Sequence, residues 1–228
     1  MKIVILTDSY GGPRLHNGVS DVKKEETYPE LVKKNLPAHE VIIHYESFRR
    51  LIHLPALLEQ YKEADLYILQ AGIVDLYPRP LTYGNTISQD FFIKVLRRLV
   101  RLNRRFVVNY IYKKPWSTEA QVRKAIQEVC KKVSSKILWL NIPPVNKLQN
   151  YKTPGANAAI QWTNEILHEE INKYKNSSEL DLYTKFTSMP DYEHYLHAND
   201  SHLNVKGNML YAVEILNFLN STSWLKES

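Results

Sequence analysis

The sequence contains little cysteine and little glycine, and it has no long apolar run. The single cysteine, Cys130, excludes a disulfide framework within the chain, and its apolar neighbours at helical spacing are typical of a packed core residue. Only seven glycines are present, and none forms a P-loop or a G-x-G-x-x-G pattern, which argues against a nucleotide-binding loop. No segment approaches the roughly 20 apolar residues of a transmembrane helix.

The N-terminus lacks the features of a secretory signal peptide. Only four apolar residues follow Lys2 before the chain turns polar at Thr7, and no small-residue cleavage site comes next. With one cysteine in the chain, we expect a cytoplasmic protein. A length of 228 residues, 44% of them hydrophobic and 24% charged, predicts one globular domain over residues 1–228.

Strand-like and helix-like segments alternate along the chain. The predicted strands are 2–6, 39–45, 64–70, 105–112 and 135–141. The predicted helices are 27–35, 50–61, 88–103, one opened by residues 117–119, 155–174 and 205–219. This alternation predicts an α/β fold, a three-layer α/β/α sandwich around a mainly parallel five-stranded sheet.

Polar segments follow four of the predicted strands. They are 8–9, 47–49, 72–75 and 113–116. Sites in open parallel sheets form outside the carboxyl ends of the strands, so these segments are expected to converge. Ser9 would present its hydroxyl there, and Asp8 and Asp75 would fix their loops by accepting backbone N–H groups.

A serine becomes a useful nucleophile only beside a base, and histidine has the suitable pKa. Among the eight histidines, His202 stands out in HANDSHLNVKG, where Asp200 precedes it and a predicted helix follows. That loop can fold over the sheet edge and bring Asp200 and His202 to Ser9, giving orienter, base and nucleophile. The alternatives are a turn residue at Ser9 and a structural histidine at 202. No second cluster at ligand spacing supports a metal site.

Three segments resemble the conserved blocks of the SGNH (GDSL) hydrolase superfamily. TDSYGGPR resembles the first block, LQAGIVD the third and NDSHLNVKG the last, so the resemblance spans residues 6 to 207. It implies a flavodoxin-like fold, no cofactor, and Ser9, His202 and Asp200 as the catalytic residues. QAGIVDLYPRPL looks most like bacterial SGNH proteins of polysaccharide and surface-glycan biosynthesis. That likeness implies a carbohydrate esterase or O-acetyltransferase, acting on an acyl and most often acetyl ester of a sugar.

The chain departs from the family where oxyanion donors are expected. Thr7 replaces the first glycine, the second-block glycine has no counterpart, and Val74 replaces the third-block asparagine. Losing one such donor typically costs about 100- to 1,000-fold in rate. The candidates to replace these donors or bind substrate are Gly72, Arg79, Arg14, Arg49 and Gln70, with Arg79 favoured. The alternative function is a non-catalytic glycan-binding or complex-forming protein.

The last block also departs from the family. The family's acid lies three residues before the histidine, where this chain has Asn199, and Asp200 lies one residue nearer. Either Asp200 orients His202, or Asn199 does so as an amide. We favour Asp200, because a carboxylate also stabilises the imidazolium.

The chain is basic, with a pI near 9.2, and its densest cationic run is Lys94 to Arg105. On a helix, the apolar residues of this run form one face and its cations cluster on the others. The pattern favours an ordinary surface helix with a solvated cationic face. A weak contact with an anionic surface is the alternative. Nucleic acid is not expected, because aromatic residues are not interleaved with the arginines.

Overall fold

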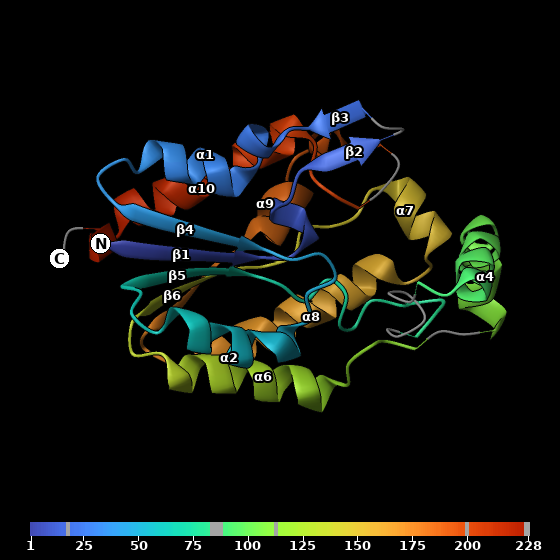
Figure 1. Ribbon diagram of the computed structural model, residues 1–228, viewed down its shortest axis with the longest axis horizontal. Helices are drawn as coiled ribbons and strands as arrows, with labels where there is room; N and C mark the ends of the chain where they lie inside the picture. Colours follow the sequence, from blue (N-terminus) through green and yellow to red (C-terminus); the bar gives the residue numbers. More distant parts are fainter. Residues whose placement is uncertain (17–18, 83–88, 112–113, 199–200, 226–228) are drawn as a thin grey trace.

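A central sheet of five parallel strands organises the chain (Figure 1). The computed structural model describes residues 1–16, 19–82, 89–111, 114–198 and 201–225. In chain order the strands are β1 (Lys2–Thr7), β4 (Glu40–Tyr45), β5 (Leu66–Gln70), β6 (Lys136–Leu140) and β7 (Ser177–Leu180). Their order in the sheet is β4-β1-β5-β6-β7, with every pairing parallel. The predicted parallel five-stranded sheet is confirmed.

Helices cover both faces of the sheet (Figure 1). On one side lie α1 (Tyr28–Asn35), α9 (Leu182–Thr187) and α10 (Val205–Ser221), and on the other α2 (Leu54–Leu58), α6 (Glu119–Lys132) and α8 (Ala156–Ile171). Alternate residues of β1 enter the two cores: Ile3 and Ile5 pack on the α1–α10 side, Val4 and Leu6 on the α2–α6 side. This two-sided burial explains why β1 is apolar without interruption and confirms the α/β/α sandwich.

The predicted strand at 105–112 is wrong. Its described residues form α5 (Arg104–Phe106) and a π-helical turn (Val107–Ile111), of which only Val107 and Val108 are buried. The β-branched and aromatic residues favoured a strand, but the described part of this segment is helical and pairs with none of the five strands. The fifth strand is β7, whose SSEL sequence gives little apolar signal because all four residues are half-buried.

Smaller elements complete the described chain. A short antiparallel hairpin of β2 (Arg14–His16) and β3 (Val19–Val22) lies where we expected a polar loop. Single 3-10 turns occur at Ser9–Gly11 (η1), Lys24–Glu26, Leu51–His53, Glu59–Tyr61, Tyr192–Tyr195 and Ser223–Leu225, and α7 spans Lys147–Lys152. Among the described residues, no helix has the length and apolarity needed to cross a membrane.

The cationic helix forms as α4 (Phe91–Leu102) but does not pack as an ordinary surface helix. It lies at the periphery of the molecule, far from the sheet (Figure 1), and none of its residues is buried. Asp90 caps it by accepting a hydrogen bond from the Ile93 backbone at 3.1 Å. The apolar face expected to pack on the protein is therefore exposed to solvent.

Candidate active site

A cavity of about 430 Å³ lies at the carboxyl ends of β4, β1 and β5. Its lining residues are Ser9, Phe48, Ile73, Val74, Tyr77, Arg79, Arg101, Arg104, Gln149, Lys152, Ser201 and His202. Segments 8–9, 47–49 and 72–75 each contribute at least one lining residue, as expected where parallel strands end at the same edge of a sheet. Of segment 113–116, residue 113 lies outside the described residues; the others do not line the cavity, but Trp116 stacks beneath Arg79.

Ser9 and His202, 193 positions apart, meet in this cavity. The Ser9 Oγ lies 2.8 Å from the His202 Nε2, within hydrogen-bond distance, and both residues are half-buried. Ser9 opens the turn η1 directly after β1, and His202 lies three residues before α10. The Tyr10 ring lies beside the imidazole, with ring centroids 5.3 Å apart. The geometry suits transfer of the serine proton to the imidazole.

Thr7, which stands in place of the family's glycine, anchors the turn that carries Ser9. Its Oγ1 accepts hydrogen bonds from the Tyr28 hydroxyl at 2.8 Å and the Gly11 backbone at 3.1 Å, and it lies 3.1 Å from the Gln70 Oε1. A Cβ at Gly11 would come within 2.5 Å of the Thr7 side chain, so the turn requires glycine there. Tyr28 could not be predicted as part of this site, because its contact with Thr7 depends on the tertiary fold.

Two buried carboxyl groups support the loops around Ser9. Asp8 Oδ1 accepts the Tyr10 N–H at 2.9 Å. Burial raises the pKa of Asp8 to about 7; the charge of nearby Asp75 adds to this rise, and the bond from Tyr10 opposes it. Asp75 accepts the Leu51 N–H at 2.8 Å and the Ser117 hydroxyl, and burial raises the pKa of Asp75 to about 6. Both groups hold backbone in place and neither lines the cavity.

Phe48 occupies the turn after β4, in the region where the family has its second-block glycine. Its φ of 61° makes it the only non-glycine residue with positive φ among the described residues. Phe48 therefore adopts the left-handed backbone conformation that usually requires glycine. The sequence predicted a turn at 47–49 but not the left-handed conformation of Phe48, since phenylalanine is unusual in that conformation. Val74 also lines the cavity, and its apolar side chain offers no donor.

Of the residues predicted to hold the oxyanion or bind substrate, some line the cavity and others do not. Arg79 lines the cavity, whereas Gly72, Arg14 and Arg49 do not. Gly72 has a φ of 118° and directly precedes lining residue Ile73; Arg14 begins the β2–β3 hairpin. Arg49 is buried and its Nη2 lies 2.7 Å from the Glu46 carboxylate. Asn199 and Asp200 lie outside the described residues.

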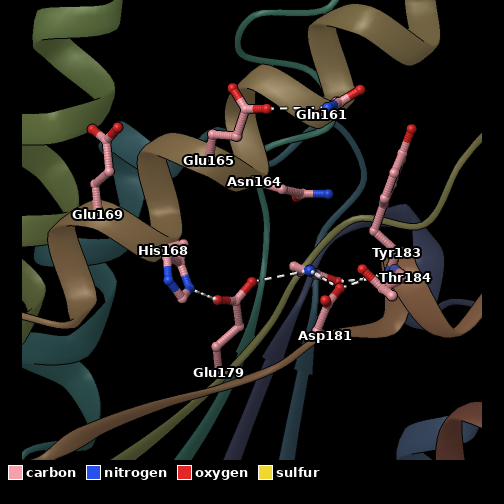
Figure 2. A pocket seen from close by; sticks show the side chains of 10 residues that line it. Gln161, Asn164, Glu165, His168, Glu169, Glu179, Asp181, Tyr183 and Thr184 are labelled. Atoms are coloured by element: carbon pink, nitrogen blue, oxygen red, sulfur yellow. Dashed lines mark hydrogen bonds and ion pairs between the residues drawn. The ribbon is translucent and has the colours of Figure 1, made fainter.

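A second cavity, of about 360 Å³, lies between α8 and the β7–α9 segment (Figure 2). Here His168 Nδ1 lies 2.8 Å from the Glu179 carboxylate, and Asn141 Nδ2 donates to Glu179 at 2.9 Å and to Asp181 at 2.8 Å. Asp181 also caps α9 by accepting the Thr184 N–H. Within the described part of the chain, no three His, Cys, Asp or Glu side chains are placed to hold a metal ion. Glu179 and Asp181 therefore have their hydrogen-bond partners within the pocket, from the Asn141 amide, the His168 ring and the Thr184 backbone.

Comparisons with known proteins agree at the level of the fold. No family model matches the sequence, and no curated protein does. A lipase/acylhydrolase from Enterococcus faecalis has a TM-score of 0.66 at 17% identity, covering 96% of this chain and 95% of its own. A lipolytic protein of the G-D-S-L family from Veillonella parvula has a TM-score of 0.61 at 14% identity, covering 97% and 99%. A carbohydrate acetylesterase from Sinorhizobium meliloti has a TM-score of 0.61 at 12% identity, covering 96% and 98%. The chain therefore has the fold of the SGNH/GDSL lipases and esterases.

Proposed function

We propose that this protein is a serine esterase or O-acyltransferase that acts on an acyl ester of a carbohydrate, with acetyl as the expected acyl group. The contact of 2.8 Å between Ser9 Oγ and His202 Nε2 carries the proposal, because a hydroxyl and an imidazole at hydrogen-bond distance in a cavity of an esterase fold could act as nucleophile and base. The proposal includes the setting expected from the sequence, polysaccharide biosynthesis in the cytoplasm.

The reaction begins when the Ser9 hydroxyl attacks the ester carbonyl carbon. Its proton passes to His202 Nε2, and the imidazolium then donates that proton to the departing sugar oxygen as the carbon–oxygen bond breaks. Water or a sugar hydroxyl then gives a proton to His202 and attacks the acyl carbon. The imidazolium returns this proton to the Ser9 oxygen as the bond to the acyl carbon breaks, which releases the acid or the new ester. Asp200 would hold the imidazole in the required orientation.

The tetrahedral intermediate needs donors for its oxyanion. We assign this task to the Ser9 N–H, to the backbone of the Phe48 turn and to the Arg79 guanidinium. The Phe48 turn supports this choice because its positive φ keeps a glycine-like path beside the cavity. Arg79 supports it because its side chain lines the same cavity as Ser9.

The second candidate is a non-catalytic protein that binds glycans or forms a complex through this cavity. Buried Val74 in place of an asparagine favours this function, since it removes one expected donor. The Ser9–His202 contact argues against it, because a binding protein has no need for a hydrogen-bonded nucleophile and base.

The test is to treat wild type, Ser9→Ala and His202→Ala with a fluorophosphonate probe and with 4-nitrophenyl acetate. We expect wild type to be labelled at Ser9 and to hydrolyse the acetate, and Ser9→Ala to do neither. If wild type is no faster than Ser9→Ala and carries no label, the esterase proposal fails and the binding function takes its place. Native fluorescence and thermal melts show whether each variant is folded.

A further inference from the structure

We propose that the Ser9 cavity contains a subsite for an anionic group of the substrate, a carboxylate or a phosphate on the acylated sugar. This inference rests on the proposed function and names its substrate class. Four cationic side chains line the cavity: Arg79, Arg101, Arg104 and Lys152. None of the described lining residues carries a carboxylate. A neutral acetylated sugar would bring no negative charge to these cations in a partly desolvated site.

Aromatic rings hold Arg79 in place, and it forms no ion pair with any residue that the structure describes. Its guanidinium lies 4.8 Å from the centre of the Tyr77 ring and 4.7 Å from that of Trp116. Its Nε is buried and has no hydrogen-bond partner. Burial, together with the nearby charge of Arg104, lowers the pKa of Arg79 to about 10. Stacking on two rings thus fixes a guanidinium whose Nε has no partner among the described residues.

Arg104 presents a second fixed guanidinium. Its Nε donates to the Thr153 hydroxyl at 2.6 Å, which orients the side chain, while its Nη2 is buried without a partner. Burial lowers the pKa of Arg104 as well. Two arginines that repel each other are stabilised together by a bound anion. Their planar forks match a carboxylate or phosphate better than a sugar hydroxyl.

One oxyanion does not account for this cluster. The tetrahedral intermediate carries a single negative charge next to Ser9, and Arg79 with backbone N–H groups is enough to meet it. Arg101, Arg104 and Lys152 come from α4, α5 and α7, whereas Ser9 follows β1. Their charge is available for a group of the substrate that does not react.

The test compares three aryl acetates that share the acyl group: 4-acetoxybenzoate, 4-acetoxyphenyl phosphate and neutral methyl 4-acetoxybenzoate. After correction for their hydroxide-catalysed rates, we expect wild type to prefer the anionic esters by about 10-fold or more in kcat/KM, the size of a charged hydrogen bond. Arg104→Gln should lower kcat/KM for the anionic esters about 10-fold more than for the neutral one. Lys131→Gln, the same loss of charge at an exposed position of α6, should preserve the preference.

The outcomes separate the subsite from the esterase proposal. If all three esters react with equal corrected efficiency and Arg104→Gln affects them equally, the subsite is wrong and the esterase proposal stands. If none reacts, calorimetry with glucuronate, glucose 1-phosphate and methyl glucoside decides. Binding of only the anionic sugars, weakened by Arg104→Gln, supports the subsite. Absence of binding overturns it. A difference between glucuronate and the phosphate identifies which anion the site takes.

The exposed apolar face of α4 carries a second inference. We infer that α4 lies on an anionic lipid bilayer, with this face in the headgroup region. Its most exposed members are Phe91, Phe92, Leu99 and Leu102, from 55% to 80% exposed. Phe106, Tyr110 and Ile111, which follow the helix in the chain, are also exposed, from 57% to 76%. A monomeric soluble protein seldom exposes apolar side chains contiguously on this scale.

Charge complementarity selects the bilayer as occupant. Lys94, Arg98 and Arg101 are exposed on the other side of α4, so apolar residues and cations divide the helix as they do in interfacial helices. Anionic headgroups match these cations, whereas a second copy of this chain would bring more positive charge to the contact. Because Arg101 also lines the Ser9 cavity, such docking brings the cavity near the lipid surface.

Sedimentation with vesicles tests this contact. We expect binding to vesicles of phosphatidylglycerol and phosphatidylcholine, little binding to phosphatidylcholine alone, and release as salt rises. Phe92→Ser should weaken binding about 10-fold, the value of burying one large side chain, while Trp162→Ser on α8 should not. No binding to anionic vesicles overturns the inference. So does a wild-type dimer that Phe92→Ser dissociates, since α4 would then cover a second copy.

Discussion

Two histidines lie in pockets at the carboxyl end of the same sheet, and their surroundings differ. His202 contacts a neutral hydroxyl in a cavity whose charged lining residues are all cations. His168 contacts Glu179 in a pocket where Asn141 already donates to two carboxylates. The first pocket therefore has hydrogen-bond donors available for a ligand. In the second pocket, the carboxylates already accept hydrogen bonds from neighbouring side chains. Topology brings both pockets to the same edge; the chemistry of the lining tells them apart.

The largest effect should separate the two histidines. His202→Ala removes the base that accepts the Ser9 proton, and we expect kcat/KM for 4-nitrophenyl acetate to fall about 100- to 10,000-fold. His168→Ala should leave kcat/KM within about two-fold of wild type, because its contact with Glu179 lies outside the Ser9 cavity. Equal losses in the two variants would contradict the division between the pockets.

A backbone change tests how closely the Ser9 side is held. Gly11→Ala places a Cβ within 2.5 Å of Thr7 and must shift the turn that carries Ser9. A displacement near 1 Å can cost about 100-fold in rate, so we expect a loss of that order in kcat with a smaller change in KM. Steady-state kinetics and a thermal melt measure it. A folded Gly11→Ala protein with wild-type kcat would show that the turn does not position Ser9.

Asp8, which holds the turn that carries Ser9, and Asp181, which lines the second pocket, should affect stability oppositely as pH changes. Burial raises the pKa of Asp8 to about 7, so as pH rises Asp8 loses its proton in the unfolded chain before it does so in the folded protein. Between about pH 4 and 7 this difference lowers the free energy of unfolding as pH rises. The slope is at most about 1.4 kcal/mol per pH unit for one group. Asp8→Asn, which keeps an acceptor for Tyr10, should gain in stability relative to wild type over this range.

Asp181 has the opposite sign. Burial alone would raise its pKa, but hydrogen bonds from Thr184 and Asn141 outweigh burial and lower it. Its stabilisation is present above the unfolded pKa and is lost as pH falls through the folded one. Asp181→Asn should therefore lose stability relative to wild type above pH 4, as urea unfolding at several pH values would show. If the free energy of unfolding changed with pH in the same direction in both variants, the opposite roles of Asp8 and Asp181 would be contradicted.

The smallest effect belongs to the His168–Glu179 pair. His168 is exposed, so a contact of this kind contributes about 0–1 kcal/mol. We expect Glu179→Gln to change the free energy of unfolding by less than about 1 kcal/mol and to leave the esterase rate unaltered. A large fall in rate would indicate that this pocket communicates with Ser9.

The sequence predicted most of the sheet because those strands carry their signal locally. Strands 2–6, 64–70 and 135–141 contain apolar runs that are buried on both faces, and 39–45 carries a shorter apolar core, Val41–Ile43, at the edge of the sheet. The carboxyl end of the first strand marked the position of Ser9. The last block likewise singled out His202. Segment 105–112 was wrongly predicted as a strand because β-branched residues favour a strand only where the segment can pair with a sheet. Strand β7 was missed because a half-buried edge strand needs few apolar residues.

Periodicity and block order in the sequence by themselves determined the layered α/β/α fold and the candidacy of Ser9 and His202. Only the tertiary structure decided what surrounds them. Arg104 and Lys152 reach the Ser9 cavity from elements with no local link to β1, and Phe48 adopts a glycine-like turn that its side chain does not suggest. The apolar face of α4 looked like a core face, because a pattern shows that a helix is amphipathic but not what covers it.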